Sequence, residues 1–396
     1  MASAAPEGVR AEVGPIDAID GLRGISVLWV MLFHYLVLCE GAADPWIAAA
    51  VRVPGLEGAI RSGPHAVDLF FLISGFLLTL PWVIARERGT PGPDTRRFYA
   101  RRLRRIVPAY YVHLALLFAL VLPLLRGWRY WRADLYVDAW NVVAHALFVH
   151  NTSPLTSGTL GVNGALWTLA VEAQFYALLP FIAPAFARAP WRSLLAALAV
   201  TAAWTWAARH DLRIVVDAYL GLGRHWSWPE EAVRRVLAIQ LPAYLADFAL
   251  GALAGHAWRR AKPRWRALPI LAMLAGVIAL GTPQGFRLAA LGEQGWIAAL
   301  TALAAILWGA AADESGIART LLARGPLAFM GRISYSAYLW HLPRLLLLQD
   351  HGPGAGSAVL FPLYLASAVA AGWISWKGLE QPFMRAAVRA TPRPAP

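Results

Sequence analysis

Long apolar stretches alternate with short polar and charged segments along the whole chain. Many of the apolar stretches are close to 20 residues long. A helix of about 20 apolar residues crosses the roughly 30 Å of hydrocarbon in a bilayer. The pattern therefore predicts an all-α fold, a polytopic transmembrane helix bundle of about ten spans. We expect these spans at residues 21–39, 66–85, 106–125, 165–187, 193–208, 236–257, 267–281, 296–312, 327–348 and 358–377.

Charged residues between the spans predict the orientation of the bundle. Arginine and lysine are concentrated in the loop at 86–105 and in the loop "RRAKPRWR" at 259–266. With ten spans, both loops fall on the same side as the two termini. Positively charged loops stay in the cytoplasm, so we expect both termini there, in a multi-pass protein of a bacterial inner membrane. The loops at 126–164 and 209–235 are expected to face outward.

The domain organisation that follows is simple. We expect a cytoplasmic N-terminal segment at 1–19, a transmembrane domain at 20–378 and a cytoplasmic C-terminal tail at 379–396. The first 19 residues are too polar for a cleaved signal peptide. Within the first outward loop, "YVDAWNVVAHALFVHN" at 136–151 is too short and too polar to span. It is expected to form an interfacial or re-entrant helix.

Composition agrees with a membrane protein. The chain is 58% hydrophobic and 15% charged, with a formal net charge of +13. In a soluble protein this charge would suggest nucleic acid, but positively charged cytoplasmic loops explain it here. The bilayer is therefore the expected partner, and nucleic acid is not. The single cysteine, Cys39, excludes an intramolecular disulfide and a cysteine metal cluster, and no metal is expected.

Two ionisable residues in the first span need an explanation. Arg23 and His34 are eleven residues apart, which is about 16 Å of helical rise and about 20° beyond three full turns. They therefore share one helix face, with His34 well inside the membrane. Ionisable groups at such depth usually face a partner or a cavity. The alternatives are that Arg23 is only a cytoplasmic anchor and that His34 is a polar packing residue.

Other spans also carry polar groups at membrane depth. Asp68 follows His65 by one turn in the second span, and Glu172 lies in the apolar run of the fourth. Buried carboxylates need partners, so we expect several helices to direct ionisable groups toward one interior. The remaining polar candidates of the fourth and ninth spans are Asn163, Gln174, Tyr176, Arg332, Ser334, Tyr335, Tyr338 and His341.

Six motifs in order resemble the acyltransferase-3 family of polytopic membrane acyltransferases. They are the Arg-x10-His pair of the first span, "VDLFFLISGFLL", "FYARRLRRIVPAYY", "NGALWTLAVEAQFYALLP", "GRISYSAYLWHLP" and "LEQPF". The resemblance implies an O-acyltransferase that moves an acyl group, often acetyl from acetyl-CoA, onto a hydroxyl of a glycan or glycoside. Some members carry a fused extracytoplasmic esterase-like domain, and we expect none here.

The residue types suit this carbohydrate O-acetylation. Acyl transfer from a thioester needs a base for the hydroxyl proton, and imidazole titrates near neutral pH. His34 matches the family's catalytic position, with Arg23 on the same helix face. A carboxylate, Asp68 or Glu172, could orient the ring. Direct transfer and a short-lived acyl-histidine both remain open. Donors that could bind substrate or stabilise the oxyanion are Asn163, Tyr176, Ser334, Tyr335, Tyr338 and His341.

An arginine cluster precedes the third span. Its members Arg101, Arg102, Arg104 and Arg105 lie where a cofactor's acyl arm could enter the bundle. Guanidinium groups match phosphate oxygens, so these residues are candidates to bind acetyl-CoA or another acyl-CoA. The simpler interpretation is a cytoplasmic stop signal.

Two other functions are compatible with the sequence. A transporter or flippase of a lipid-linked sugar would also have many spans and intramembrane charges, although related halves are not visible. An inactive family member that only scaffolds an assembly is a further alternative. The sequence identifies neither the acceptor nor the side of the membrane on which the acceptor lies.

Overall fold

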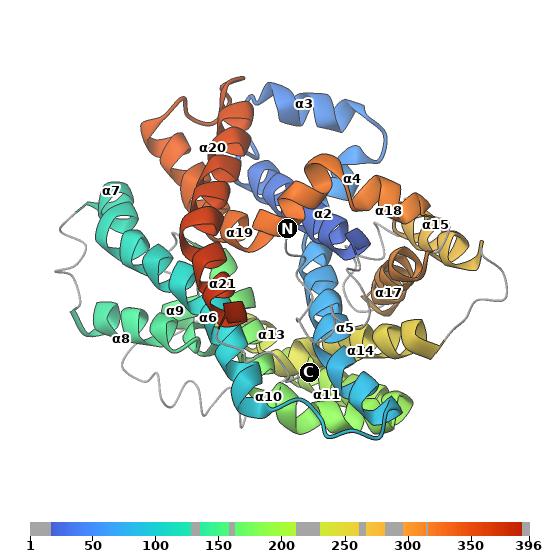
Figure 1. Ribbon diagram of the computed structural model, residues 1–396. Coiled ribbons are helices and arrows are strands. Elements are labelled where there is room, and N and C mark those ends of the chain that lie inside the picture. The colour runs from blue at the N-terminus through green and yellow to red at the C-terminus, as the bar shows by residue number, and fades with distance from the viewer. Residues whose placement is uncertain are drawn as a thin grey trace. The chain divides into compact units, whose positions relative to one another are not determined.

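The computed structural model describes residues 17–127, 135–157, 163–210, 230–260, 267–281, 296–313 and 316–389. Within these ranges all regular structure is helical and no strand occurs, which confirms the all-α prediction (Figure 1). The chain forms two compact units. Unit 1 comprises Met1–Pro93, Ala183–Trp191 and Asp247–Lys377, and unit 2 comprises Asp94–Ile182, Arg192–Ala246 and Gly378–Pro396.

Each of the predicted spans falls on a helix. In chain order these helices are α2 (Asp17–Leu38), α5 (His65–Glu87), α6 (Thr95–Leu116) with η1 (Leu117–Val121) and α7 (Leu122–Arg126), α10 (Trp167–Arg188), α11 (Pro190–His210), α13 (Glu230–Ala238) with α14 (Leu241–Arg260), α15 (Leu268–Gly281), α17 (Trp296–Ala312), α19 (Gly325–His351) and α20 (Leu360–Ser375). Between them lie α3 (Pro45–Arg52), α4 (Leu56–Arg61), α8 (Leu135–Ala146), η3 (His150–Thr152), α9 (Pro154–Ser157), η5 (Gly164–Leu166), α18 (Ile317–Leu322), η6 (Trp376–Glu380) and α21 (Gln381–Arg389).

Five of the described helices are long and apolar enough to cross a membrane. They are Ala18–Leu38, His65–Glu87, Thr95–Arg126, Gly164–Arg188 and Glu231–Arg260. The ten crossings and the cytoplasmic termini therefore stay predictions. The expected N-terminal segment lies almost wholly outside the described residues. The expected C-terminal tail at 379–396 takes in the end of η6 and helix α21, and 390–396 lie outside the described residues.

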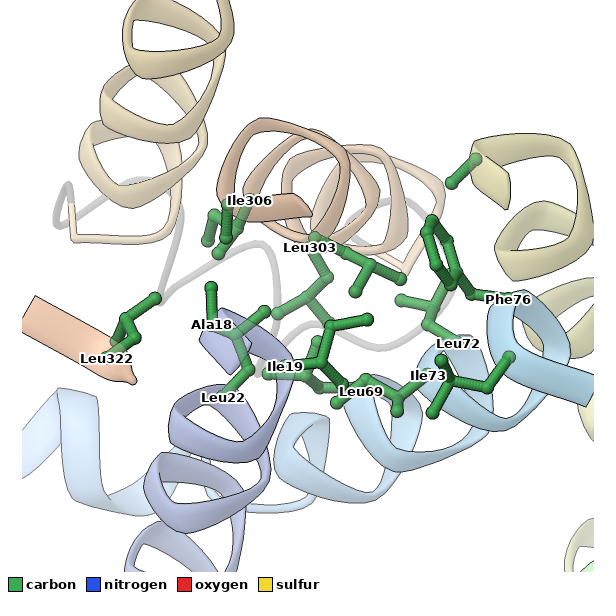
Figure 2. Packing of buried hydrophobic residues seen from close by; sticks show 14 of the residues in the cluster. Ala18, Ile19, Leu22, Leu69, Leu72, Ile73, Phe76, Leu303, Ile306 and Leu322 are labelled. Carbon is green, nitrogen blue, oxygen red and sulfur yellow. The ribbon is translucent and has the colours of Figure 1, made fainter. Parts of the chain in front are cut away.

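The apolar core of unit 1 joins α2, α5, α17 and α18 (Figure 2). Helix α5 contributes Leu69, Leu72, Ile73 and Phe76, whose spacing of three and four residues places them on one face. They pack against buried residues of the other three helices, such as Leu303 of α17. Lipid tails are as apolar as these side chains, so the contact is stabilised by close packing more than by exclusion of water.

Glycines let the backbones of α2 and α19 touch. A Cβ atom added at Gly331 would lie 1.7 Å from the carbonyl oxygen of Asp20, and one at Gly24 would lie 2.1 Å from that of Leu327. Only glycine fits such a contact, the small-residue packing typical of membrane helices. This contact positions the candidate site residues of α2 against those of α19.

Helices α5 and α14 touch in the same way. A Cβ atom at Gly75 would lie 2.0 Å from the carbonyl oxygen of Phe248, and one at Gly251 would lie 2.0 Å from that of Leu72. Asp68 and Asp247 lie within two turns of these contacts on their own helices. The glycines therefore bring two acidic residues of unit 1 close together.

In unit 2, one continuous helical segment runs from Thr95 to Arg126. Its N-terminus is capped by Asp94, whose carboxylate accepts a 2.7 Å hydrogen bond from the backbone N–H of Arg97. Such a cap satisfies one of the N–H groups that have no partner inside a helix. The cap fixes the start of the turns that carry the arginine cluster. Helices α8 and α21 both pack against α6.

Candidate active site

His34 of α2 contacts His341 of α19. The Nδ1 atom of His34 lies 3.1 Å from Nε2 of His341, and the two ring centroids are 5.0 Å apart. His341 is fully buried, whereas His34 is only partly buried. The pair thus has one inner and one more accessible ring.

Hydrogen bonding assigns the protons of this pair. Nδ1 of His341 lies 2.6 Å from the carbonyl oxygen of Tyr338, which can only accept, so Nδ1 carries the hydrogen. In the neutral ring Nε2 is then an acceptor, and Nδ1–H of His34 donates to it. That same Nδ1 lies 3.1 Å from the carbonyl oxygen of Val30, again an acceptor. Neutral His34 is therefore left with its lone pair on Nε2, the form that a general base needs.

Arg23 meets the same helix as His34. Its Nε donates to Oγ of Ser334 at 3.4 Å, a long hydrogen bond, and Ser334 is buried. Both ionisable side chains of the first predicted span thus lie on the face that packs against α19. The ring of Tyr338 lies 5.2 Å from that of His341, and Tyr335 is buried on the same helix.

Asp68 has partners of its own. Its carboxylate lies 2.7 Å from Nδ1 of His65, and the fully buried Asp247 of α14 is its nearby acidic neighbour. Within the described residues, the hydrogen bonds of His34 go to His341 and Val30. Asp68 is paired with His65 here, and its proposed role in orienting His34 stays a prediction.

Glu172 lies in unit 2, where it binds Tyr176 and lies near Arg102. The hydroxyl of Tyr176 donates a short hydrogen bond to the Glu172 carboxylate. The guanidinium of Arg102 lies over the rings of Phe98 and Tyr176, 5.9 and 5.8 Å from their centroids. Cations are attracted to aromatic faces at this distance. Glu172, Tyr176 and Arg102 therefore form one cluster. The sequence suggested a catalytic role for the first, a substrate-binding role for the second and a cofactor-binding role for the third.

The four arginines before the third predicted span differ in burial. Arg102 is buried, Arg101 and Arg105 are partly exposed, and Arg104 is exposed. Arg102 is thus turned toward the protein interior. Arg101, Arg104 and Arg105 keep at least part of their side chains exposed.

Asn163 is a buried residue of unit 2. Its side-chain nitrogen lies 3.1 Å from Nε2 of His113 on α6, and both residues are fully buried. The sequence analysis gave no role to His113, although a histidine in an apolar run was a visible signal.

Asp247 and Glu380 are among the buried acids to which the sequence gave no role. Asp247 lies in the sixth predicted span, and its carboxylate was visible in that apolar run. Glu380 is buried in the π-helical turn η6, within the "LEQPF" motif. Insertions of this kind into α-helices are frequent at functional sites. Among the described residues no group of three or more His, Cys, Asp or Glu side chains is placed to hold a metal ion.

Comparison with known proteins gives one family and several relatives. The acyltransferase domain of the acyltransferase-3 family matches residues 16–377. The chain is 27% identical over 334 residues to the exopolysaccharide production protein ExoZ of Rhizobium meliloti. This alignment covers 82% of this chain and 90% of ExoZ. The chain is also 27% identical over 172 residues to the peptidoglycan O-acetyltransferase OatA of Listeria monocytogenes, 42% of this chain and 24% of OatA. No solved structure matches the chain.

Proposed function

The chain belongs to the acyltransferase-3 family, and we propose that it moves an acyl group, acetyl in the first instance, from acyl-CoA to a hydroxyl of a glycan or glycoside. It is an integral membrane acyltransferase. We propose in addition an acyl-CoA donor, a glycan or glycoside acceptor and a set of catalytic residues.

The observation that carries the chemistry is the His34–His341 pair. We assign Nε2 of His34 as the atom that takes the proton of the acceptor hydroxyl. The hydroxyl oxygen then bonds to the thioester carbonyl carbon, the carbon–sulfur bond breaks, and the proton passes from His34 to the coenzyme A thiolate. A short-lived acyl group on the same Nε2 atom would be an equally balanced route.

His341 supports His34 during this step. When Nε2 of His34 gains a proton, its ring becomes positive, and Nδ1–H donates more strongly to Nε2 of His341. The bond from Nδ1 of His341 to the Tyr338 carbonyl holds the second ring in orientation. His341 thereby takes the orienting role for which the sequence suggested a carboxylate.

Arginines supply positive charge in each of the two units. Arg104, with the partly exposed Arg101 and Arg105, suits the phosphates of coenzyme A because these side chains are accessible near the start of α6. Arg102 belongs to the same turns, and its contact with Tyr176 makes it an internal support of that site. Arg23 is placed by Ser334 on the face of α2 that carries His34.

The names of two relatives support the proposed acceptor class. ExoZ is named for exopolysaccharide production and aligns over 90% of its length. OatA is named as a peptidoglycan O-acetyltransferase, and 24% of its length aligns with this chain. We propose a surface glycan or a glycoside as the acceptor, with Asn163, Tyr335 and Tyr338 among the polar groups that bind substrate. We also propose that the chain crosses a bacterial inner membrane ten times, with both termini in the cytoplasm.

The test is thioester consumption by the purified full-length protein in lipid nanodiscs. With acetyl-CoA and an extracted surface glycan we expect free thiol and glycan-bound acetyl in equal amounts. A transporter would move sugar without releasing thiol, so absence of both products across a panel of glycans and glycosides would contradict the proposal.

A further inference from the structure

Helix α8 carries its polar residues inside and its apolar residues outside. Asp138, Asn141 and His145 recur at helical spacing and are all buried. On the opposite side, Val143 is 45% exposed, and Leu147 directly after the helix is 64% exposed. A helix at a water-facing surface has the reverse arrangement. The exposed face of α8 is therefore suited to hydrocarbon.

Other groups of the protein donate hydrogen bonds to the last backbone carbonyls of α8. The last carbonyls of a helix have no partner within the helix and often bind water. Here the hydroxyls of Tyr110 and Tyr111 on α6 donate to the carbonyls of His145 and Ala146, at 3.0 and 2.9 Å. The backbone N–H of Val149 donates to the carbonyl of Ala144. Such internal pairing is what a helix end within lipid requires.

An apolar groove lies between α8 and the α6–η1 segment. Its volume is about 550 Å³, and it is lined by Tyr111, Leu114, Ala115, Phe118, Ala119, Val142 and Ala146. The groove wall on α6 continues into the exposed apolar residues Val112, Leu116 and Leu120 of the membrane-spanning segment Thr95–Arg126. The groove thus opens onto the lipid-facing surface of that segment.

We propose that α8 lies within the hydrocarbon of the bilayer and that the groove between α8 and α6 binds one acyl chain of a phospholipid. With twelve residues, α8 is about 18 Å long, too short to cross the roughly 30 Å of hydrocarbon. It is therefore a re-entrant or in-plane helix. This inference concerns a lipid-binding surface and does not depend on the proposed acyl transfer.

Spin labels test the environment of α8. Cys39 is the chain's only cysteine and is buried, so Cys39→Ala gives a background for single labels. Val143→Cys and Leu147→Cys report on the outer face, and Thr90→Cys in an exposed polar loop is the water reference. The labelled proteins are measured in phosphatidylcholine nanodiscs. At positions 143 and 147 we expect oxygen to relax the spin label more than a water-soluble nickel chelate does. At position 90 we expect the nickel chelate to relax the label more than oxygen does.

Two results would overturn the first half of the proposal. Stronger relaxation by nickel at 143 and 147 would place α8 in water. Protection from both reagents would mean that a second protein surface, such as another copy of the chain, covers this face. Because the two labelled positions are exposed, failure of one variant to fold leaves the other as a test.

The acyl chain is tested by fluorescence quenching in the full-length protein. Ala119→Cys, labelled with bimane in the groove wall, is compared with labelled Val143→Cys on the open face of α8. The quencher is phosphatidylcholine brominated on its acyl chains. On dilution with detergent, we expect quenching at 119 to persist after quenching at 143 is lost. Equal loss at both positions would refute a bound chain.

Discussion

Replacing Gly331 by alanine should uncouple the histidine pair. The new Cβ atom would start 1.7 Å from the Asp20 carbonyl oxygen, whereas such contacts are not found below 3.0 Å. The backbones of α2 and α19 must therefore separate by about 1.3 Å. If this displacement reaches the pair, the 3.1 Å distance between His34 and His341 grows to about 4.4 Å, too long for a hydrogen bond. A misplacement of about 1 Å can reduce a rate roughly 10²-fold.

The assay is acetyl transfer by protein in nanodiscs at saturating donor, with thermal unfolding measured on the same preparation. Gly75→Ala is the matched control, because its Cβ atom would lie 2.0 Å from the Phe248 carbonyl oxygen at a contact that does not include α2 or α19. We expect both variants to lose stability but only Gly331→Ala to lose about 10²-fold in rate. A Gly331→Ala enzyme with the parent rate would refute the link between backbone contact and catalysis.

The other expected outcomes concern single side chains. His341→Ala should lower kcat by about 10²-fold without raising KM for acetyl-CoA. His341→Asn should recover part of the rate, because its amide oxygen can accept a hydrogen bond from His34. No recovery would argue against a role for the His34–His341 hydrogen bond. Arg102→Gln should lower thermal stability because two ring contacts are lost. Arg104→Gln should instead raise KM for acetyl-CoA at unchanged stability. A raised KM in Arg102→Gln at unchanged stability would return Arg102 to the donor site. Asp68→Asn should keep a rate within a few-fold of the parent, since the hydrogen-bond partner of Asp68 is His65, and a large loss at normal stability would support a catalytic role.

Helix positions were predictable because apolar runs and polar loops determine them. All the predicted spans fall on helices, and the three-turn relation between Arg23 and His34 was enough to place both on one face. The partner of His34 was not predictable. His341 is 307 residues away, and the contact depends on Gly24 and Gly331, whose role is visible only when two backbones meet.

Burial within the arginine cluster also needed the structure. The sequence gives Arg101, Arg102, Arg104 and Arg105 similar spacing, and only packing against Tyr176 distinguishes Arg102. Helix α8 was hard to interpret for a related reason. Its polar residues are too many for a spanning helix, and only their burial shows that they face the protein interior.

The most direct test of the central claim is the acyl-transfer rate of His34→Ala, measured at saturating acetyl-CoA beside a binding assay for the donor. The proposed base predicts a loss of roughly 10²–10⁴-fold in rate with donor binding retained. His65→Ala, which removes another membrane-helix histidine outside the pair, is the control and should lose far less. A His34→Ala protein that transfers acetyl within a few-fold of the parent would contradict the mechanism and leave His34 as a packing residue of α2.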